Sequence, residues 1–499
     1  MITPNVELDS LDTLAASRFD GYLARKDVVR CYARQYSIPT YVVEFLLRRF
    51  CATVDEFDIA MGFQLVENEL EDRRVKLGQE QIFKQRPREK ARVKMIDFLT
   101  VKAAARKDSY VAELPSLALQ DVQISKRLVQ DHARLLTDGF YAEFTLEYDP
   151  LLAQEQHGRP FRVAELCPIQ MAHSDVLNVF FQGRSAFSTA EWIDFLIRSI
   201  GLEPKALTDR ARNVALLRMI PFVERNYNLV EFGPRGTGKS YVFQQMSPYS
   251  RILSDGQTTV ARMFGNHARE HRGLVCQYDV VCVEEISGVS FDQVDGVNNI
   301  KNYLATGEFD DGKKSVRANG SIAMVGIFDL ELQQQQHLGH LLRTLPTEMR
   351  DDTAFHDSIH AYVPGWEFPT LNPNEHMTVH FGLVTDFLSE CWSRLRSTSR
   401  LSTVEKRVEF GAALDRRDID AVNKTAGGLL KLLFPDPSAW IPDDDLESIV
   451  RISLESRRRV KEQQKRCLKS KFRNTNFSYT LGANGVERFV STPELDVSS

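Results

Sequence analysis

A short motif near the middle of the chain constrains its fold more than any other part of the sequence. It fits the phosphate-loop pattern G-x-x-x-x-G-K-[ST] and consists of Gly233, Pro234, Arg235, Gly236, Thr237, Gly238, Lys239 and Ser240. Glycine tolerates positive φ angles, so backbone N–H groups of such a loop can curl around phosphate oxygens. The apolar run at 228–232 predicts a buried strand before the loop, and residues 241–246 predict a helix after it. The motif therefore predicts a unit that binds a nucleoside triphosphate, with these residues around the nucleotide.

The roles of the motif's polar side chains follow from phosphate chemistry. Lys239 is predicted to reach the β- and γ-phosphates of ATP, and Ser240 to ligate Mg²⁺. A triphosphatase also needs acids at the end of a neighbouring strand, and the stretch YDVVCVEE at 278–285 supplies them. Glu284 is predicted to hold Mg²⁺ through water, and Glu285 to orient and deprotonate the attacking water. The alternative is a buried strand that happens to end in two surface acids.

Strand-like and helix-like stretches alternate after the motif. Residues 278–285 and 321–328 predict strands, and residues 291–305 predict a helix between them. This alternation is typical of a mostly parallel α/β sheet. The strand at 321–328 is expected to end in a polar residue that senses the γ-phosphate. Ile327 stands at that place, and Asp329 is the nearest polar substitute.

The remainder of the chain suggests several further segments. Apolar residues at three-to-four spacing predict helices before residue 75, and the stretches that follow predict a small, OB-like β-barrel or a sandwich. The expected segments are an N-terminal helical region at 1–78, a β-rich domain at 79–150, a linker with leading helices at 151–205, an α/β ATPase core at 206–372, a helical lid at 373–436, a basic C-terminal helix at 437–475 and a polar tail at 476–499.

Charge limits where nucleic acid could bind. The formal net charge of the 499 residues is −5, so binding must come from local basic patches. The best-placed patch is a predicted hairpin whose turn is Asp311-Gly312, with Lys313, Lys314 and Arg317 beside it. Other basic stretches lie at 84–94 and 457–473. For each of the three, the alternative is a solvated surface with no ligand.

Other features exclude whole classes of protein. The seven cysteines form no C-x-x-C pair, which argues against a disulfide framework and favours a reducing cytoplasm. The acidic N-terminus lacks the apolar core of a signal peptide, and no uncharged apolar run predicts a membrane helix. The pairs His267/His271 and His356/His360 have helical spacing. Without an evident third ligand they predict ordinary histidines rather than a metal site.

Several long stretches together resemble one family. They are EWIDFLIRSIG, LLRMIPFVERNYNLVEFGPRGTGKSYVFQQM, FHDSIHAYVPGWE and GGLLKLLFP. The sequence resembles the BrxL family, Lon-like AAA+ ATPases of bacterial BREX phage-resistance systems, over nearly its whole length. The resemblance implies an AAA+ core with a helical lid, a DNA-associated N-terminal region and rings of identical subunits around DNA. It also implies ATP and Mg²⁺ as cofactors, and other BREX components as possible partners.

The sequence departs from that family pattern at several places. The family continues into a C-terminal Lon-type protease-like domain, whereas this chain ends at Ser499 and has no Ser/Lys dyad motif, so we expect an ATPase and not a protease. Glu284 replaces the usual Asp. Ser358 stands where the family has a residue that resembles an arginine finger. The candidate substitutes are Arg343 and Arg350 for the finger, and Arg416 and Arg417 for a lid arginine.

These departures leave alternative functions open. The first is a ring ATPase that remodels DNA or moves along it. The second is an ATP-gated DNA clamp with weak or no hydrolysis, which the residues at 327 and 358 favour. The third and weakest is the ATPase half of a protease partnership.

Overall fold

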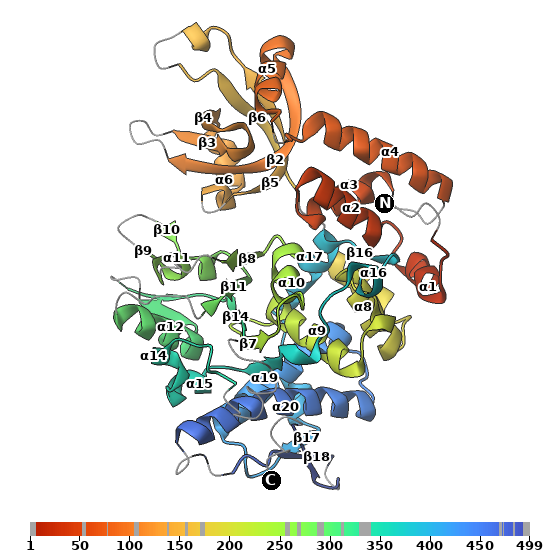
Figure 1. The fold of residues 1–499 in the computed structure, drawn as a ribbon, viewed down its shortest axis with the longest axis vertical. Helices are drawn as coiled ribbons and strands as arrows, with labels where there is room; N and C mark the ends of the chain where they lie inside the picture. Colours follow the sequence, from red (N-terminus) through yellow and green to blue (C-terminus); the bar gives the residue numbers. More distant parts are fainter. Residues whose placement is uncertain are drawn as a thin grey trace. The chain divides into compact units, whose positions relative to one another are not determined.

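The computed structural model describes most of the chain as two compact units (Figure 1). Unit one contains residues 1–7 and 20–173, and unit two contains residues 8–19 and 174–499. The described residues are 6–51, 56–76, 78–103, 109–136, 139–154, 158–169, 175–254, 260–266, 271–286, 294–310, 314–328, 341–468, 472, 474–482 and 485–492.

Unit one begins with helices, as the apolar spacing predicts. They are α2 (Lys26–Tyr36), α3 (Thr40–Phe50), α4 (Glu56–Arg73) and α5 (Glu80–Lys90), preceded by the short strand β1 (Leu23–Arg25). One face of α2 is buried, including Val28 and Tyr32. A buried ion pair of 2.6 Å between Lys26 and Glu44 joins α2 to α3. The basic stretch at 84–94 is therefore mostly helix α5 rather than part of the β-rich segment.

A closed five-stranded barrel follows these helices, which decides between the barrel and the sandwich. Its strands are β2 (Arg92–Ala103), β3 (Tyr110–Leu114), β4 (Leu119–Ile124), β5 (Phe140–Tyr148) and β6 (Phe161–Pro168), in the order β2-β3-β4-β6-β5. The short helix α6 (Lys126–Asp131) follows β4. Alternate residues such as Met95, Leu99 and Phe144 fill its core. Arg74, the residue directly after α4, donates to the buried Asp97 over 2.6 Å.

The last barrel strand lies where the sequence predicted a linker. The residues of β6 pair with β5 in antiparallel fashion and with β4 in parallel fashion. Phe161 and Val163 point into the core, with Arg162 exposed between them. Ala164, Glu165 and Pro168 are residue types that strands disfavour, so the local signal of β6 is weak, and its pairing partners lie elsewhere in the chain.

Unit two is built around a five-stranded sheet. Its strands are β7 (Asn228–Gly233), β8 (Ser250–Leu253), β11 (Val280–Glu284), β14 (Ser321–Ile327) and β15 (Ala361–Pro364). The order is β15-β7-β14-β11-β8, and every neighbouring pair is parallel. The prediction of a mostly parallel α/β sheet is therefore confirmed. Apolar runs such as that of β7 are buried throughout, as parallel strands covered by helices require.

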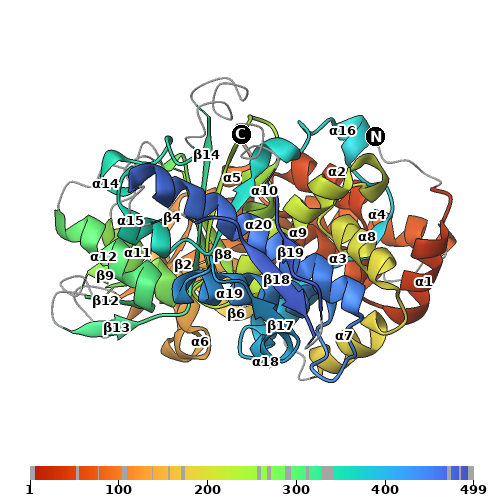
Figure 2. The same cartoon turned by 90° about the horizontal axis from the view of Figure 1, so that it is seen from below.

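Helices and minor strands surround this sheet. The longer helices are α8 (Thr189–Ser199), α9 (Asp209–Val223), α12 (Val294–Thr306), α17 (Thr385–Leu395), α19 (Arg416–Leu433) and α20 (Asp443–Cys467). The shorter ones are α1 (Ser10–Arg18), α7 (Val176–Arg184), α10 (Lys239–Gln245), α11 (Val260–Phe264), α14 (Thr347–Arg350), α15 (Thr353–Asp357), α16 (Pro373–His376) and α18 (Leu401–Glu405). The minor strands are β9 (Gly265–Asn266), β10 (His271–Arg272), β12 (Glu308–Asp310), β13 (Ser315–Arg317) and β16 (Phe381–Leu383). Figure 2 shows α20 alongside α19, which packs in turn on α9.

Four basic residues of α20 fit neither interpretation of the sequence, a patch that binds nucleic acid or a solvated surface. Arg457, Arg458, Arg459 and Lys461 are each at most 5% exposed, so they are neither solvated nor available to nucleic acid. Arg457 Nε donates to Asp418 over 2.8 Å, and Lys461 Nζ donates to the same carboxylate over 2.5 Å. The buried Asp418 of α19 neutralises Arg457 and Lys461, which is the condition for placing charge inside a protein. These two cations fasten α20 to α19.

The segment expected to be a polar tail also contains strands. The strand β18 (Ser478–Leu481) pairs with β17 (Val408–Phe410) and with β19 (Arg488–Phe489) in an antiparallel sheet. Tyr479 is 2% exposed, and its hydroxyl donates to Glu447 of α20 over 2.9 Å. All seven cysteines are free, as the sequence predicted. Within the described ranges, the helices are all too short or too polar to cross a membrane.

The histidine pair at 356 and 360 is held by backbone groups. His356 is fully buried, and its Nε2 lies 2.9 Å from the carbonyl oxygen of Arg350. His360 Nδ1 accepts a hydrogen bond of 2.9 Å from the backbone N–H of Asn228. Burial lowers the pKa of both rings. His267 lies outside the described residues.

The lowered pKa of His356 predicts a pH-dependent stability. Below pH ~6.5 the unfolded chain binds a proton that the folded chain does not, so stability should fall as the solution becomes more acidic. The slope from one such group is at most about 1.4 kcal/mol per pH unit. His356→Gln keeps a donor for the Arg350 carbonyl and should flatten the profile between pH 7 and 5.5. Denaturant unfolding at each pH measures this, and parallel profiles for wild type and variant would contradict it.

Candidate nucleotide-binding site

The phosphate loop leaves the sheet at the end of β7, where two backbones meet closely. A Cβ on Gly233 would lie 2.6 Å from the carbonyl carbon of Gly365, so only glycine fits there. Gly236 and Gly238 have φ angles of +77° and +70°, which other residues adopt at an energetic cost. On one side the carbonyl oxygen of Gly236 accepts a hydrogen bond of 2.9 Å from the Leu371 N–H. The loop conformation is thus fixed by the chain itself.

Lys239 and Ser240 begin α10 directly after the loop. The Lys239 side chain is folded back, and Nζ donates to the carbonyl oxygens of Gly233 and Pro234 over 3.2 and 2.5 Å. It also donates to the Thr237 hydroxyl over 3.3 Å. Burial lowers the pKa of Lys239. These acceptors are weak competitors for an ammonium group, because a phosphate oxygen carries full charge.

The two acids of β11 lie at the same edge of the sheet as the loop. The parallel register places Glu284 opposite Val325 of β14, and Ile327 of β14 opposite Gly233 of β7. The Ser240 hydroxyl donates a hydrogen bond to the carboxylate of Glu284. The next residue, Glu285, has a φ of +48°, a conformation that costs energy for any residue except glycine.

These side chains surround one cavity. Its volume is about 210 Å³, and it is lined by residues 235–241, by Glu284 and Glu285, and by residues 325–327. The structure thus brings together Lys239, Ser240 and both acids, which the sequence singled out from two distant stretches. Pro234 and Gly233 support the loop from behind and do not line the cavity.

At the positions expected for the γ-phosphate sensor and the arginine finger, this chain has Ile327 and Ser358. Ile327 lines the cavity with an apolar side chain, and Asp329 lies outside the described residues. Ser358 is buried, and its carbonyl oxygen accepts a hydrogen bond of 2.8 Å from the Asn228 side chain. An arginine finger acts on a neighbouring subunit, so its place in one chain is an outer surface.

The four candidate arginines differ in their surroundings. Arg350 lies 3.5 Å from Asp351, and Arg417 is paired with Asp357. Arg343 and Arg416 are exposed. Within this chain none of the four lines the cavity.

Two residues behind the loop were not predicted from the sequence. Arg218 of α9 and Glu231 of β7 are 1% and 0% exposed, and Nη2 of the arginine lies 2.6 Å from the carboxylate. Arg218 Nη1 also donates to the carbonyl oxygen of Thr237 over 3.0 Å. The available signal was a charged residue inside each of two apolar stretches, VALLRMIPFV and NLVEFG.

Comparison with known proteins agrees with this geometry. The family model described as "Lon-like protease BrxL-like, ATPase domain" matches residues 161–478, and the one described as "BREX system Lon protease-like protein BrxL N-terminal" matches residues 17–148. The chain is 39% identical over 484 residues to the Lon-like protease BrxL of Escherichia coli O9:H4 (strain HS), covering 97% of this chain and 69% of that protein. The chain belongs to the BrxL family. The Lon-like protease BrxL of Bacillus cereus (strain H3081.97) is 38% identical, with 98% and 71% covered.

The hairpin that we expected to contact DNA is partly described in this BrxL-family chain. Strands β12 and β13 are antiparallel, with Glu308 opposite Arg317 and Asp310 opposite Ser315. Lys314 and Arg317 are exposed. Lys313 and the turn at 311–312 lie outside the described residues. The hairpin thus carries two exposed cations close to its turn.

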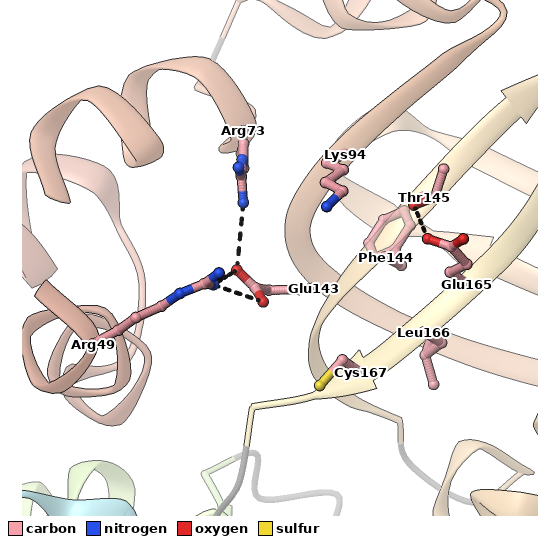
Figure 3. Close-up of a pocket in the computed structure, with 9 residues that line it drawn as sticks. All are labelled: Arg49, Arg73, Lys94, Glu143, Phe144, Thr145, Glu165, Leu166 and Cys167. Atoms are coloured by element: carbon pink, nitrogen blue, oxygen red, sulfur yellow. Dashed lines mark hydrogen bonds and ion pairs between the residues drawn. The ribbon is translucent and has the colours of Figure 1, made fainter. Parts of the chain in front are cut away.

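Part of the basic stretch at 84–94 binds other residues of unit one. Arg86 donates to the carbonyl oxygen of Asp72 over 2.5 Å, and Arg92 is paired with Glu147. Lys94 is exposed and lines a cavity of about 170 Å³ between the helices and the barrel of unit one (Figure 3). In that cavity Arg49 and Arg73 both point at Glu143, at 3.2 and 3.5 Å. The acids there offset much of the basic charge.

Unit two contains a further cluster of residues of the kinds that bind metal ions, and an arginine neutralises the negative charge of this cluster. Oxygens of Asp9 and Asp12 and a ring nitrogen of His380 lie within 4.8 Å of one another. Arg198 donates to Asp9 over 2.5 Å and lies 3.4 Å from Asp12. The guanidinium supplies the positive charge that a metal would otherwise bring, so the cluster fastens α1 to α8.

Replacing the cavity's two central side chains should separate binding from turnover. Lys239→Ala removes a charge on the β- and γ-phosphates and should weaken ATP binding at least about tenfold, since hydrogen bonds to charged groups contribute roughly 1.5–3 kcal/mol. Glu285→Gln should keep ATP binding but lower turnover by about 10²–10⁴-fold, because an amide cannot accept the proton. Equilibrium binding and phosphate release measure the two effects. Equal turnover in wild type and both variants would contradict the assignment of this site.

Proposed function

We propose that this chain is an AAA+ ATPase that assembles into a ring, binds DNA and couples ATP hydrolysis to remodelling of DNA or movement along it. One observation carries the proposal: Lys239, Ser240, Glu284 and Glu285 line a single cavity at the carboxyl edge of a parallel sheet. Membership of the BrxL family supports anti-phage defence as the setting. Other components of a BREX system are the proposed protein partners.

The residues of the cavity fit MgATP. The Ser240 hydroxyl and the Glu284 carboxylate are in contact, and both are oxygen ligands of the kind that Mg²⁺ prefers. Bound Mg²⁺ supplies charge neutralisation to the phosphates. Lys239 exchanges its backbone carbonyl partners for phosphate oxygens, and the loop N–H groups hold the remaining oxygens. Glu285 accepts the proton of the attacking water.

A clamp that binds ATP but hydrolyses it poorly is the second candidate. It is favoured by the apolar Ile327, which lines the cavity. It is also favoured by Ser358, which is buried and stands where the family has a residue that resembles an arginine finger. Arg343, which is exposed, and Arg350 are the candidates for contact with a neighbour's nucleotide, and Arg416 and Arg417 are the candidate lid arginines. ATP turnover with and without DNA separates the two functions. DNA-stimulated turnover supports the motor, and ATP binding without turnover supports the clamp.

The DNA-binding hairpin can be tested through salt dependence. Changing Lys313, Lys314 and Arg317 to Ala should weaken DNA binding at all sequences, because phosphates carry no sequence information. Each phosphate that the protein neutralises contributes about 0.9 to the slope of log K against log salt on duplex DNA, so the slope should become flatter in the variant. Binding titrations from low to moderate salt measure the slope, while ATP binding should remain at the wild-type level.

A matched control removes the same amount of charge elsewhere. Arg88, Lys90 and Lys94 are exposed residues of the basic stretch, and their triple Ala variant has the same net charge as the hairpin variant. Its slope should stay at the wild-type value. If the control variant has the flatter slope and the hairpin variant keeps the wild-type slope, with assembly intact, the DNA site lies on unit one instead.

We also expect the chain to lack peptidase activity, although the relatives are named Lon-like proteases. The pure chain with ATP should leave an unfolded substrate such as casein intact, as measured by gel electrophoresis over hours. The Lys239→Ala variant is the control for contamination. Cleavage by wild type that is absent from this variant would refute the expectation.

A further inference from the structure

A buried ion pair lies directly behind the phosphate loop. Glu231 belongs to the strand that ends in the loop, and Arg218 approaches it from α9. Arg218 Nε lies 3.0 and 3.2 Å from the two carboxylate oxygens, and Nη2 lies 2.6 Å from one of them. Buried pairs of this kind often contribute little net stability, because removing both charges from water offsets their attraction.

The remaining guanidinium nitrogen touches the loop itself. Arg218 Nη1 donates a hydrogen bond of 3.0 Å to the carbonyl oxygen of Thr237, one residue before Gly238. The guanidinium also lies 4.2 Å from the centre of the Phe368 ring, in the segment whose Leu371 N–H binds Gly236. One side chain thus connects α9, β7, the loop and the segment that covers it.

The pair also sets the electrostatic environment of the Lys239 ammonium group. Glu231 and Arg218 carry opposite charges directly behind the loop, so their electrostatic effects on the Lys239 ammonium oppose each other. A carboxylate behind the loop without its partner would attract the Lys239 ammonium and repel the phosphates in front. With Arg218 in place, the nearest acceptors of Lys239 are uncharged carbonyl and hydroxyl oxygens.

We propose that Arg218 is a positioning residue for the nucleotide: it neutralises Glu231 and fixes the Thr237 carbonyl, so that Lys239 is available to the phosphates. The inference rests on the proposed nucleotide site. Arg218 does not line the cavity, and it acts through Glu231, Thr237 and Lys239.

A charge-balance series tests this role. Arg218→Gln leaves Glu231 buried and unpaired, and it should weaken ATP binding at least about tenfold, since a hydrogen-bonded charge contributes roughly that factor. The double variant Arg218→Gln/Glu231→Gln removes both charges and should restore most of the wild-type affinity. Arg218→Lys keeps the charge but cannot bridge Glu231 and Thr237 with a planar fork, so it should lie between wild type and Arg218→Gln. Equilibrium binding of ATP with Mg²⁺ to the full chain is the measurement.

A second buried arginine provides the matched control. Arg198 is also 1% exposed, and its guanidinium is bound by Asp9 and Asp12 rather than by a residue of the loop. Arg198→Lys should lower the melting temperature to a similar extent as Arg218→Lys while leaving ATP affinity unchanged. If Arg218→Gln does not fold, the comparison of the two Lys variants and the double variant still decides.

The outcomes distinguish this inference from the proposed function. Wild type that binds no ATP refutes the nucleotide site as a whole. Wild-type affinity in Arg218→Gln or Arg218→Lys refutes the positioning role alone. A folded double variant that binds ATP as weakly as Arg218→Gln refutes the neutralisation of Glu231. Loss of ATP affinity in Arg198→Lys, equal to that in Arg218→Lys, reduces the effect to general stability and overturns the role.

Discussion

The parallel register of β7, β14 and β11 is the constraint on which the candidate site depends. Backbone hydrogen bonds align Gly233 with Ile327, and Val325 with Glu284, so three chain segments end at one edge. In parallel α/β sheets that edge is where ligands bind. The loop, the proposed metal ligands Ser240 and Glu284, and the proposed base Glu285 meet there because the strands end there. The arrangement of the candidate site is therefore a consequence of the strand order and not of the phosphate loop alone.

Charge burial is the second organising feature of unit two. Arg218 with Glu231, Arg198 with Asp12, and Arg457 with Asp418 are all buried pairs. Each joins two different secondary-structure elements, and Arg198 and Asp12 are 186 residues apart in the sequence. Removing one partner of such a pair leaves an uncompensated buried charge, which is far more costly than replacing both. These pairs specify which helix lies against which neighbour, and one of them adjoins the phosphate loop.

The barrel of unit one shows why local signals identify some strands and miss others. The strands β2 and β5 are long and alternate strongly, so their apolar residues predict them directly. The strand β6 contains Ala164, Glu165 and Pro168, which are residue types that strands disfavour. Its place depends on closing the barrel between β4 and β5, a requirement that no local window contains.

The amino-acid sequence alone predicts the phosphate loop, its flanking strand and helix, and the acids at 284 and 285. These features follow from short-range patterns: glycine where φ must be positive, apolar runs where strands are buried, and acids at a strand end. The folded structure alone shows that Arg457, Arg459 and Lys461 of α20 are internal and that Arg218 supports the loop from behind. The physical reason is that burial of a charge depends on a partner such as Asp418 or Glu231, which approaches only when the chain is folded.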